Sequence, residues 1–438
     1  MSPAVSLSAY ARLIRDNRNV RLLWMAQIVS ELGDWFYSVA IYSFLLEVTG
    51  SAKAVGIAFV LQVLPQTIVS PAAGVINDRI SRKRVMIFAD WMRAGIVLAM
   101  TLVRTREMVW LLYVLLFLET VLWALFEPAH NAVIPNITGD GDELIIANTL
   151  SSTTWSFNFA IGSALGGLAA AFFGRGTVFV LNALSFVLSA LLISRMHFAE
   201  PHADSLPPVR AREFLDYSPI VEGARYVGRN RKLLVTMLVK GGLGLMGTNW
   251  VLIPIFGIQL FPLHVAHLNS QQDGTLGMSI LMAFRGVGAI FGAFLGTSFT
   301  GFSPPRLRVS ILAGFVLGAL GYAALSVAPS LLAACAALVV AHAGGSVIWV
   351  ASTTLIQQQA EDRFRGRVFS AEFAVNMLIL SAASYAAGVT IDMGIAPRSV
   401  ALATGLLLVA PIIAWLFALR LWRSDRESGL SYNQAKLG

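Results

Sequence analysis

Long apolar runs alternate with short polar segments along the whole chain. The alternation of single apolar and polar residues that marks a membrane strand is absent. A helix needs about 20 apolar residues to cross a bilayer. Twelve runs approach or exceed that length: Leu22–Leu46, Ala54–Ile76, Val85–Val103, Val109–Phe126, Thr154–Phe173, Val178–Met196, Leu233–Leu260, Leu276–Phe299, Val309–Val327, Leu331–Ile356, Val368–Ile391 and Val400–Leu421. The pattern predicts an all-α membrane protein with twelve transmembrane helices.

Composition agrees with this class, because 56% of the 438 residues are hydrophobic and only 13% are charged. The first run is of full spanning length and lacks a small-residue cleavage site, so we expect it to remain as the first span. Cys335 is the only cysteine, which excludes an internal disulfide. His264 and His267 have a metal-like spacing, but no third ligand is near. No metal or cofactor is therefore predicted.

The basic residues indicate the orientation in the membrane. Most of the 32 lysines and arginines lie before the first run and in every second loop after it, whereas the intervening loops hold few. Cytoplasmic loops carry such an excess, so both termini are predicted to be cytoplasmic. Anionic lipid head groups account for the basic excess, and no nucleic-acid partner is needed.

The longest loop divides the chain into two halves. Its segment "AEPHADSLPPVRAREF" is rich in proline and charge, as a linker is. We predict an N-terminal six-helix bundle at 1–197, a cytoplasmic linker at 198–232 and a C-terminal six-helix bundle at 233–438. The linker is expected to end in an amphipathic helix, Ser218–Val227. Two six-span repeats are a transporter architecture.

Three motifs resemble a known family. The stretch "GVINDRISRKRV", 74–85, lies in the predicted cytoplasmic loop between the second and third spans. It is similar to the signature loop of the major facilitator superfamily, which has a glycine, three residues, Asp-Arg and a basic cluster. Gly74, Asp78, Arg79, Arg82 and Lys83 match, and Ser81 replaces the usual glycine before the basic cluster. "FEPAHNAVIP" and "EDRFRGRVFS" resemble the bacterial drug-efflux and siderophore-export branch, which includes macrolide efflux proteins and the enterobactin exporter.

The resemblance implies two pseudo-symmetric six-helix bundles, and it has two departures. Ser163 stands where drug–proton antiporters often have proline on the fifth span, and their arginine on the fourth span is missing. It also implies that Asp78 meets the start of the eleventh span when the cytoplasmic side is shut. That helix start carries a partial positive charge. The predicted latch comprises Gly74, Asp78, Arg79, Arg363, Arg365 and Arg367. Arg82, Lys83 and Arg84 are expected only to fix the topology.

Three acids in apolar runs are candidates for proton coupling: Asp34, Glu119 and Glu31. Asp34 lies roughly 18 Å along a helix from the start of the first span, close to mid-membrane. A charge at that depth should face a cavity or a partner. The first and fourth spans line the central cavity in the superfamily that the chain resembles. Desolvation and like charge both favour the protonated carboxyl there, which suggests a proton or cation site.

The cations inside the spans have several interpretations. Asp90 and Arg93, three residues apart on one helix, are expected to neutralise each other. Arg285 could bind an anionic group of a substrate, or pair with Asp34 or Glu119. Lys240 is a substrate-cavity candidate but could also extend to the cytoplasmic face. Trp35, beside Asp34, could line an apolar cavity, although such residues more often pack against lipid.

The leading hypothesis is a secondary active transporter that exports an amphipathic small molecule, drug- or siderophore-like, by proton antiport with alternating access. Alternatives are a proton-coupled uptake symporter, a lysolipid transporter and a non-transporting receptor or scaffold. No GxxxxGK[ST] loop points to direct use of ATP. Six scattered histidines do not form an enzyme site. We expect a monomer in the bacterial plasma (inner) membrane.

Overall fold

The computed structural model describes residues 7–139, 142–200, 217–300, 303–420 and 422. Within these ranges every predicted span falls on helix and no strand occurs, which confirms the all-α fold class. Ten helical stretches of the described chain are long and apolar enough to cross a membrane. The two predicted spans not among them are α2 (Arg18–Thr49), which carries Glu31 and Asp34, and α4 (Arg82–Met100), which carries Asp90 and Arg93.

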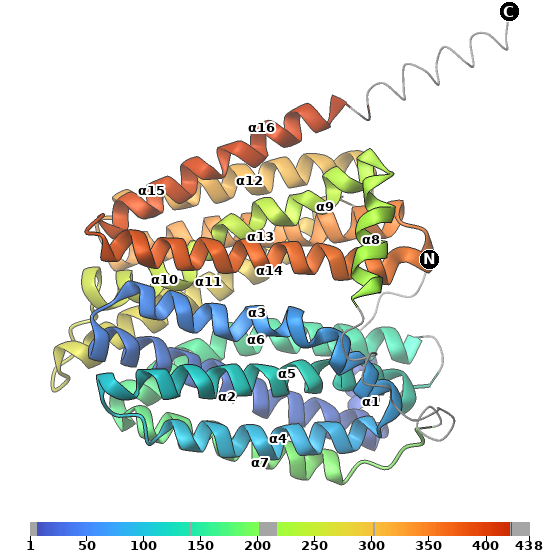
Figure 1. Cartoon of the computed structure of the whole chain (residues 1–438), viewed down its shortest axis with the longest axis horizontal. Coiled ribbons are helices and arrows are strands. Elements are labelled where there is room, and N and C mark those ends of the chain that lie inside the picture. The colour runs from blue at the N-terminus through green and yellow to red at the C-terminus, as the bar shows by residue number, and fades with distance from the viewer. Residues whose placement is uncertain (1–6, 140–141, 201–216, 301–302, 421, 423–438) are drawn as a thin grey trace, which may run out of the picture. The chain divides into compact units, whose positions relative to one another are not determined.

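The chain forms two compact units, Met1–Asp216 with Ile253–Gly286, and Tyr217–Leu252 with Val287–Gly438. The division into 1–197, 198–232 and 233–438 stays a prediction. Residues 201–216 of the predicted linker lie outside the described residues. Figure 1 labels the helices along the chain.

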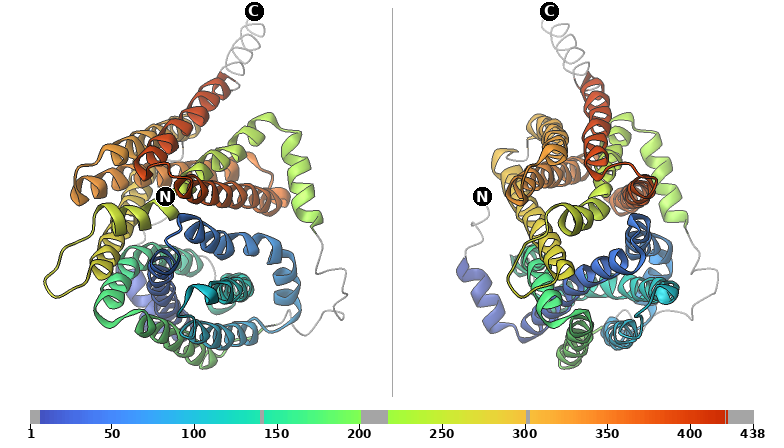
Figure 2. Two further views of the ribbon diagram at one scale, coloured as in Figure 1. Left: turned by 60° about the vertical axis from the view of Figure 1, so that its left-hand side comes forward. Right: turned by 90° about the vertical axis from the view of Figure 1, so that its left-hand side faces the viewer.

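The first unit is built on the helices of the first half of the chain. It contains α1 (Leu7–Asp16), α2, α3 (Ala52–Arg79), α4, a short 3-10 turn (Arg106–Met108), α5 (Val109–Ile137), α6 (Asp142–Phe173), α7 (Arg175–Ser194), a π-helical turn (Phe256–Leu260) and the first part of α11 (Ser270–Thr300). Within it α2 packs on α6 and α7, and α4 packs on α5 and α7. The short α1 contacts α2 and α6 and lies outside the main bundle (Figure 2).

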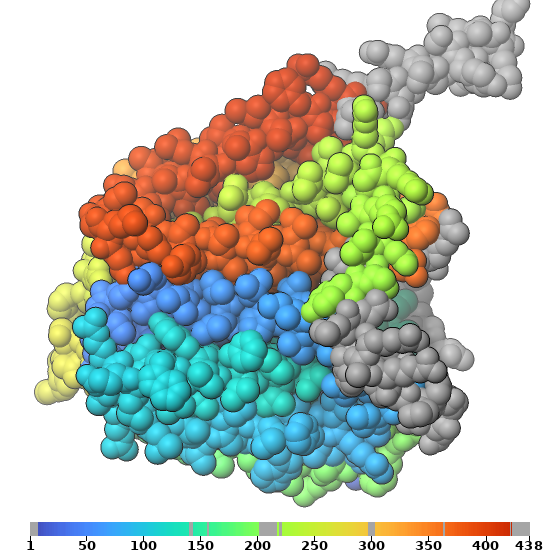
Figure 3. All heavy atoms as spheres, viewed as in Figure 1, coloured from blue at the N-terminus to red at the C-terminus, as the bar shows by residue number. Residues whose placement is uncertain are grey.

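The second unit holds the remaining helices. They are α8 (Ser218–Gly228), α9 (Arg231–Gly244), a 3-10 turn (Leu245–Thr248), most of α10 (Asn249–Ile255), the rest of α11, α12 (Pro304–Val327), α13 (Leu331–Gln359), α14 (Asp362–Asp392), α15 (Pro397–Leu407) and α16 (Val409–Ala418). The predicted amphipathic helix is present as α8. It packs on α14 near the N-terminal end of that helix (Figure 3). There, the ring of Tyr226 stacks on that of Phe364.

Turn residues explain where the first helices begin and end. The side chain of Asn17 accepts hydrogen bonds from the backbone N–H groups of Asn19 and Val20, which caps α2. Gly50 ends α2 with φ = +64°, a left-handed conformation that glycine adopts without strain. Ser51 then caps α3 by accepting from Ala54 N–H. These local bonds set the junctions, and packing of the apolar faces holds the helices together.

Gly33 allows α2 to approach α7 closely beside the candidate site. A Cβ atom at this position would lie 2.2 Å from Oδ1 of Asn182 and 2.3 Å from Oγ of Ser185. A larger side chain would therefore require the side chains of Asn182 and Ser185 to move. Asp34 is the next residue on α2.

Candidate functional site

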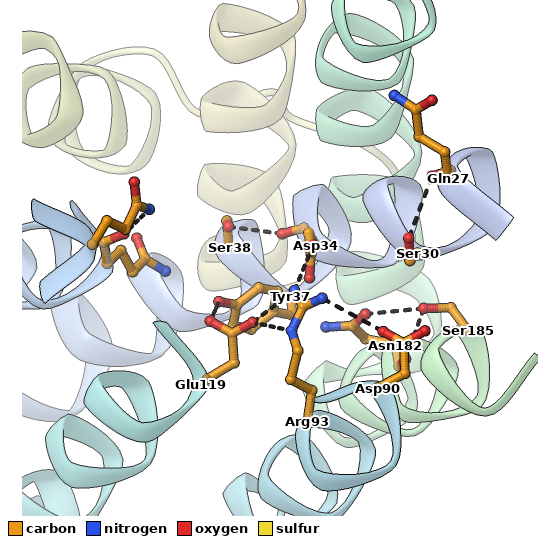
Figure 4. A network of polar contacts seen from close by, with 12 residues as sticks. Gln27, Ser30, Asp34, Tyr37, Ser38, Asp90, Arg93, Glu119, Asn182 and Ser185 are labelled. Carbon is orange, nitrogen blue, oxygen red and sulfur yellow. Dashed lines mark hydrogen bonds and ion pairs between the residues drawn. The ribbon is translucent and has the colours of Figure 1, made fainter. Parts of the chain in front are cut away.

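Arg93 on α4 is the centre of a buried charge cluster in the first unit (Figure 4). One terminal nitrogen of its guanidinium lies 2.9 Å from Oδ2 of Asp34 on α2. Nε donates to Oε1 of Glu119 on α5 at 2.8 Å. Asp90 on α4 is the third acid, with Oδ1 3.8 Å from Arg93. One cation thus ties three helices together through carboxylates.

Most of the cluster is buried, so water screens its charges poorly. The Arg93 guanidinium carbon lies 4.0 Å from the ring centroid of Phe186 on α7. The Tyr37 hydroxyl donates to Oε2 of Glu119 at 3.1 Å. Arg93 is 1% exposed and Glu119 5%, whereas the Asp34 side chain is 22% exposed. Asp34 is therefore the carboxylate of the Arg93–Glu119 network that solvent or a ligand can reach.

The expected ion pair of Asp90 and Arg93 is present, with 3.8 Å between Oδ1 and a terminal nitrogen of the guanidinium, but it is only one part of a larger cluster. The guanidinium directs its hydrogen bonds to Asp34 and Glu119 instead, and Asp90 stays at ion-pair distance. Helices α2 and α5 lie close enough for the planar fork of arginine to reach both. One feature of the sequence could have predicted this cluster. Arg93 is the only lysine or arginine within the first four predicted spans, which also contain Asp34, Asp90 and Glu119.

Arg285 on α11 lies in the same unit but against different groups. Its guanidinium carbon is 4.5 Å from the ring centroid of Phe159 on α6. Arg93, not Arg285, makes the ion pairs recorded for Asp34 and Glu119. Trp35 packs edge-on to the same Phe159 ring, with centroids 4.3 Å apart. Arg285 and Trp35, the two substrate-cavity candidates of the first unit, thus both contact Phe159 of α6.

Glu31 lies one turn before Asp34 on α2 and forms a separate network. Its Oε1 accepts from Nε2 of Gln27 and its Oε2 accepts from Nδ2 of Asn158, both at 2.8 Å. Amide donors satisfy this carboxylate without a cation. Of the three acids predicted for proton coupling, the structure brings Asp34 and Glu119 together on Arg93 and places Glu31 beside them.

Lys240 on α9 forms a second buried ion pair, in the second unit. Its Nζ lies 2.9 Å from Oε2 of Glu372 on α14 and 2.9 Å from Oγ1 of Thr353 on α13. Lys240 is 4% exposed and Glu372 1%, so the lysine does not extend to a helix end. Sequence reasoning missed Glu372, although it lies inside the predicted eleventh span.

The basic cluster after α3 makes specific bonds within the first unit. Ser81 caps α4 by accepting from Arg84 N–H, and its hydroxyl donates to Glu200. Arg82 donates to the carbonyl oxygen of Ala132 at 2.9 Å, and Lys83 donates to that of Met196 at 2.7 Å. Arg82 and Lys83 therefore fasten the loop to α5 and to the end of α7, which goes beyond the topological role expected for them.

The predicted latch residues occupy helix ends of different units. Gly74, Asp78 and Arg79 lie in the last turns of α3, and Asp78 is exposed. Arg365 and Arg367 lie in the first turns of α14. Arg367 pairs with Glu222 of α8 at 2.7 Å. The side chain of Arg363 lies outside the described residues. The latch itself stays a prediction.

Comparisons with known proteins agree on the type of protein. A family model described as transmembrane secretion effector matches residues 7–437. Macrolide efflux protein A of Streptococcus pyogenes is 27% identical over 245 residues, which cover 55% of this chain and 57% of that protein. The chain thus matches little more than half the length of that relative. The putative bacilysin exporter BacE of Bacillus subtilis (strain 168) is 26% identical over 315 residues, 70% of this chain and 73% of BacE.

A solved structure shows the same fold. The nucleoside transporter NupG superposes with a TM-score of 0.70 at 11% identity, covering 91% of this chain and 98% of NupG. At that identity the likeness concerns the fold alone. Together with the apolar helices, the family match makes this a multi-pass membrane protein. The chain belongs to the transmembrane secretion effector family, within the major facilitator superfamily.

Proposed function

We propose that this protein is a secondary active exporter that moves an amphipathic small molecule out of the cell in exchange for protons. The observation that carries the proposal is the cluster in which Arg93 binds Asp34 and Glu119 at 2.9 and 2.8 Å. A single guanidinium cannot neutralise three carboxylates in a poorly hydrated site, because each uncompensated charge there is costly. Protonation of one of the three carboxylates would lower this cost, so the cluster favours binding a proton.

Asp34 is the group that we assign to proton exchange. Its side chain is 22% exposed, whereas Glu119 is 5% exposed and also receives the Tyr37 hydroxyl. When Asp34 takes up a proton it loses its charge, and its bond to Arg93 weakens. Arg93 then remains on Glu119 and Asp90, and α2 is freer to move relative to α4. A proton on Asp34 can therefore bias a two-state carrier.

The relatives support export as the direction. One is named a macrolide efflux protein and another a putative bacilysin exporter. By analogy we assign the chain to the bacterial plasma membrane, as a monomer with both termini in the cytoplasm. Transported molecules of this kind combine apolar and polar parts, and the aromatic neighbours Trp35 and Phe159 would suit such a molecule.

Transport by purified protein in liposomes tests the proposal. A macrolide and ethidium serve as probes, and a trapped pH-sensitive dye reports proton movement. We expect a pH gradient to drive probe accumulation by the wild type. Asp34→Asn should abolish this accumulation but retain exchange of probe for probe. Glu107→Gln, which neutralises an exposed acid just before α5, is the matched control and should behave as wild type. Gradient-driven accumulation by Asp34→Asn with normal proton flux would refute the coupling role.

A further inference from the structure

The second unit contains a site that surrounds an ammonium group. The Nζ atom of Lys240 contacts a carboxylate oxygen of Glu372 and the hydroxyl of Thr353, both at 2.9 Å. It also lies 4.0 Å from the ring centroid of Trp349 and 5.9 Å from that of Phe369. Three helices, α9, α13 and α14, bring these groups together.

These groups are the ones that recognise ammonium ions in general. Two oxygen acceptors match two of the three N–H donors of a primary ammonium, and an indole face attracts the positive charge. Lys240 alone would be enough to neutralise Glu372. The Thr353 hydroxyl and the rings of Trp349 and Phe369 are not needed for that, and with Glu372 they form a cage around the ammonium group.

The carboxylate of Glu372 has binding capacity left over. Its Oε2 atom accepts from Lys240, whereas its buried Oε1 atom accepts no hydrogen bond from any residue that the structure describes. A buried acceptor in that state is costly, because it has lost water without gaining a partner. A second N–H donor at this oxygen would remove the cost.

The site has a side from which a ligand can approach. Lys240 and Glu372 are 4% and 1% exposed, but Trp349 keeps 41% of its surface exposed. The indole therefore forms the wall between the ammonium and the outside of the described structure. Movement of this one side chain would open the cage without separating the helices.

We propose that Glu372, Thr353 and Trp349 form a binding site for the ammonium group of a transported amine, and that Lys240 occupies it as a tethered stand-in. An arriving amine takes the place of the Lys240 ammonium, whose flexible stem can carry it toward the start of α9. The inference rests on the proposed transport function and deepens it, because it names amphipathic amines as a substrate class.

Equilibrium binding to the purified full chain in nanodiscs tests the site. The probe is 2-phenylethylammonium, and 2-phenylethanol is the uncharged control of similar size. Lys240→Met removes the tethered cation and keeps the length of the side chain. We expect it to bind the amine at least about tenfold more tightly than the wild type, because the ligand no longer competes with Lys240. Affinity for the alcohol should not change.

Matched variants assign the gain to the cage. Glu372→Gln added to Lys240→Met should remove the gain. Lys232→Met, the same change at a half-buried position in the first turn of α9, should bind as wild type. An amine affinity of Lys240→Met equal to that of the wild type, or an equal gain for the alcohol, would overturn the proposal.

Two further variants keep the test decisive if Lys240→Met fails to fold. Trp349→Leu and Thr353→Val leave the Lys240–Glu372 pair in place, and both should weaken amine binding to the otherwise unchanged protein. Unchanged amine affinity in both would overturn the site. Binding needs neither a gradient nor transport. Loss of the site with intact proton-driven export would therefore refute only this inference, whereas amine binding without export would refute only the proposed function.

Discussion

Replacing Arg93 by methionine should destabilise the first unit more than almost any other single change. Methionine retains much of the apolar volume of arginine, so the change removes mainly the charge and its hydrogen bonds. Arg93 makes hydrogen bonds of 2.8 and 2.9 Å to two acids. A hydrogen bond to a charged group contributes about 1.5–3 kcal/mol. Two of them agree with the loss of about 3–5 kcal/mol that follows when one partner of a buried ion pair is removed.

The geometry predicts that lysine cannot replace arginine. A lysine ammonium keeps the charge but is a point donor, whereas the guanidinium fork reaches Asp34 and Glu119 at once. We expect Arg93→Lys to lose one of the two bonds, about 1.5–3 kcal/mol. Arg93→Met alone leaves the Glu119 carboxylate without its cation, and Glu119→Gln removes that charge. The double variant should therefore lose less unfolding free energy than the sum of the two single losses, by about 0.5–3 kcal/mol.

Reversible unfolding in mixed detergent micelles, followed by tryptophan fluorescence at fixed pH, measures these free energies. Arg104→Met, the same substitution at an exposed loop position, is the control and should stay within about 0.5 kcal/mol of the wild type. The reasoning would be refuted by an Arg93→Met protein as stable as this control. Strictly additive effects of Arg93→Met and Glu119→Gln would also contradict it, because residues in direct contact should couple.

Two further predictions concern the loop that follows α3. Ser81→Ala should lower the unfolding free energy by about 0.5–2 kcal/mol because it removes the cap of α4. Ser81→Gly should lower it by only about a few tenths of a kcal/mol, because glycine is tolerated at a cap position. Equal losses would show that the hydrogen bond to Glu200, and not the cap, is what the serine contributes. Asp78→Asn should widen the distance between spin labels on the 79–82 and 360–363 segments and slow turnover, because an interaction with a helix end contributes about 0.3–1 kcal/mol. Unchanged distances with normal transport would rule out the latch.

The sequence by itself determined the fold class and the positions of the spans. The apolar runs had to become helices because a bilayer offers no partner for free backbone N–H and C=O groups. Asn17 and Ser51 mark helix starts because a short polar side chain can cap them locally. The amphipathic helix in the loop was predicted almost to the residue and is present as α8. All of these features depend on neighbours within a few residues.

The sequence also identified part of the candidate site. Asp34 and Glu119 stood out because an acid within an apolar run needs a partner. Their partner was not predicted, because Arg93 had a nearer acid, Asp90, on its own helix. Likewise, Lys240 was recognised as unusual, but its partner Glu372 lies 132 positions away in the sequence.

Only the tertiary structure decided which charge meets which. Periodicity assigns a residue to a depth and to a face of its own helix, and every acid at the right depth then remains a possible partner. Close packing selects among them. A Cβ atom at Gly33 would overlap side-chain oxygens of Asn182 and Ser185 on α7, and the next residue, Asp34, lies within reach of Arg93 on α4. Helix contacts are fixed by the shapes of both surfaces together, so a single stretch of sequence does not contain them.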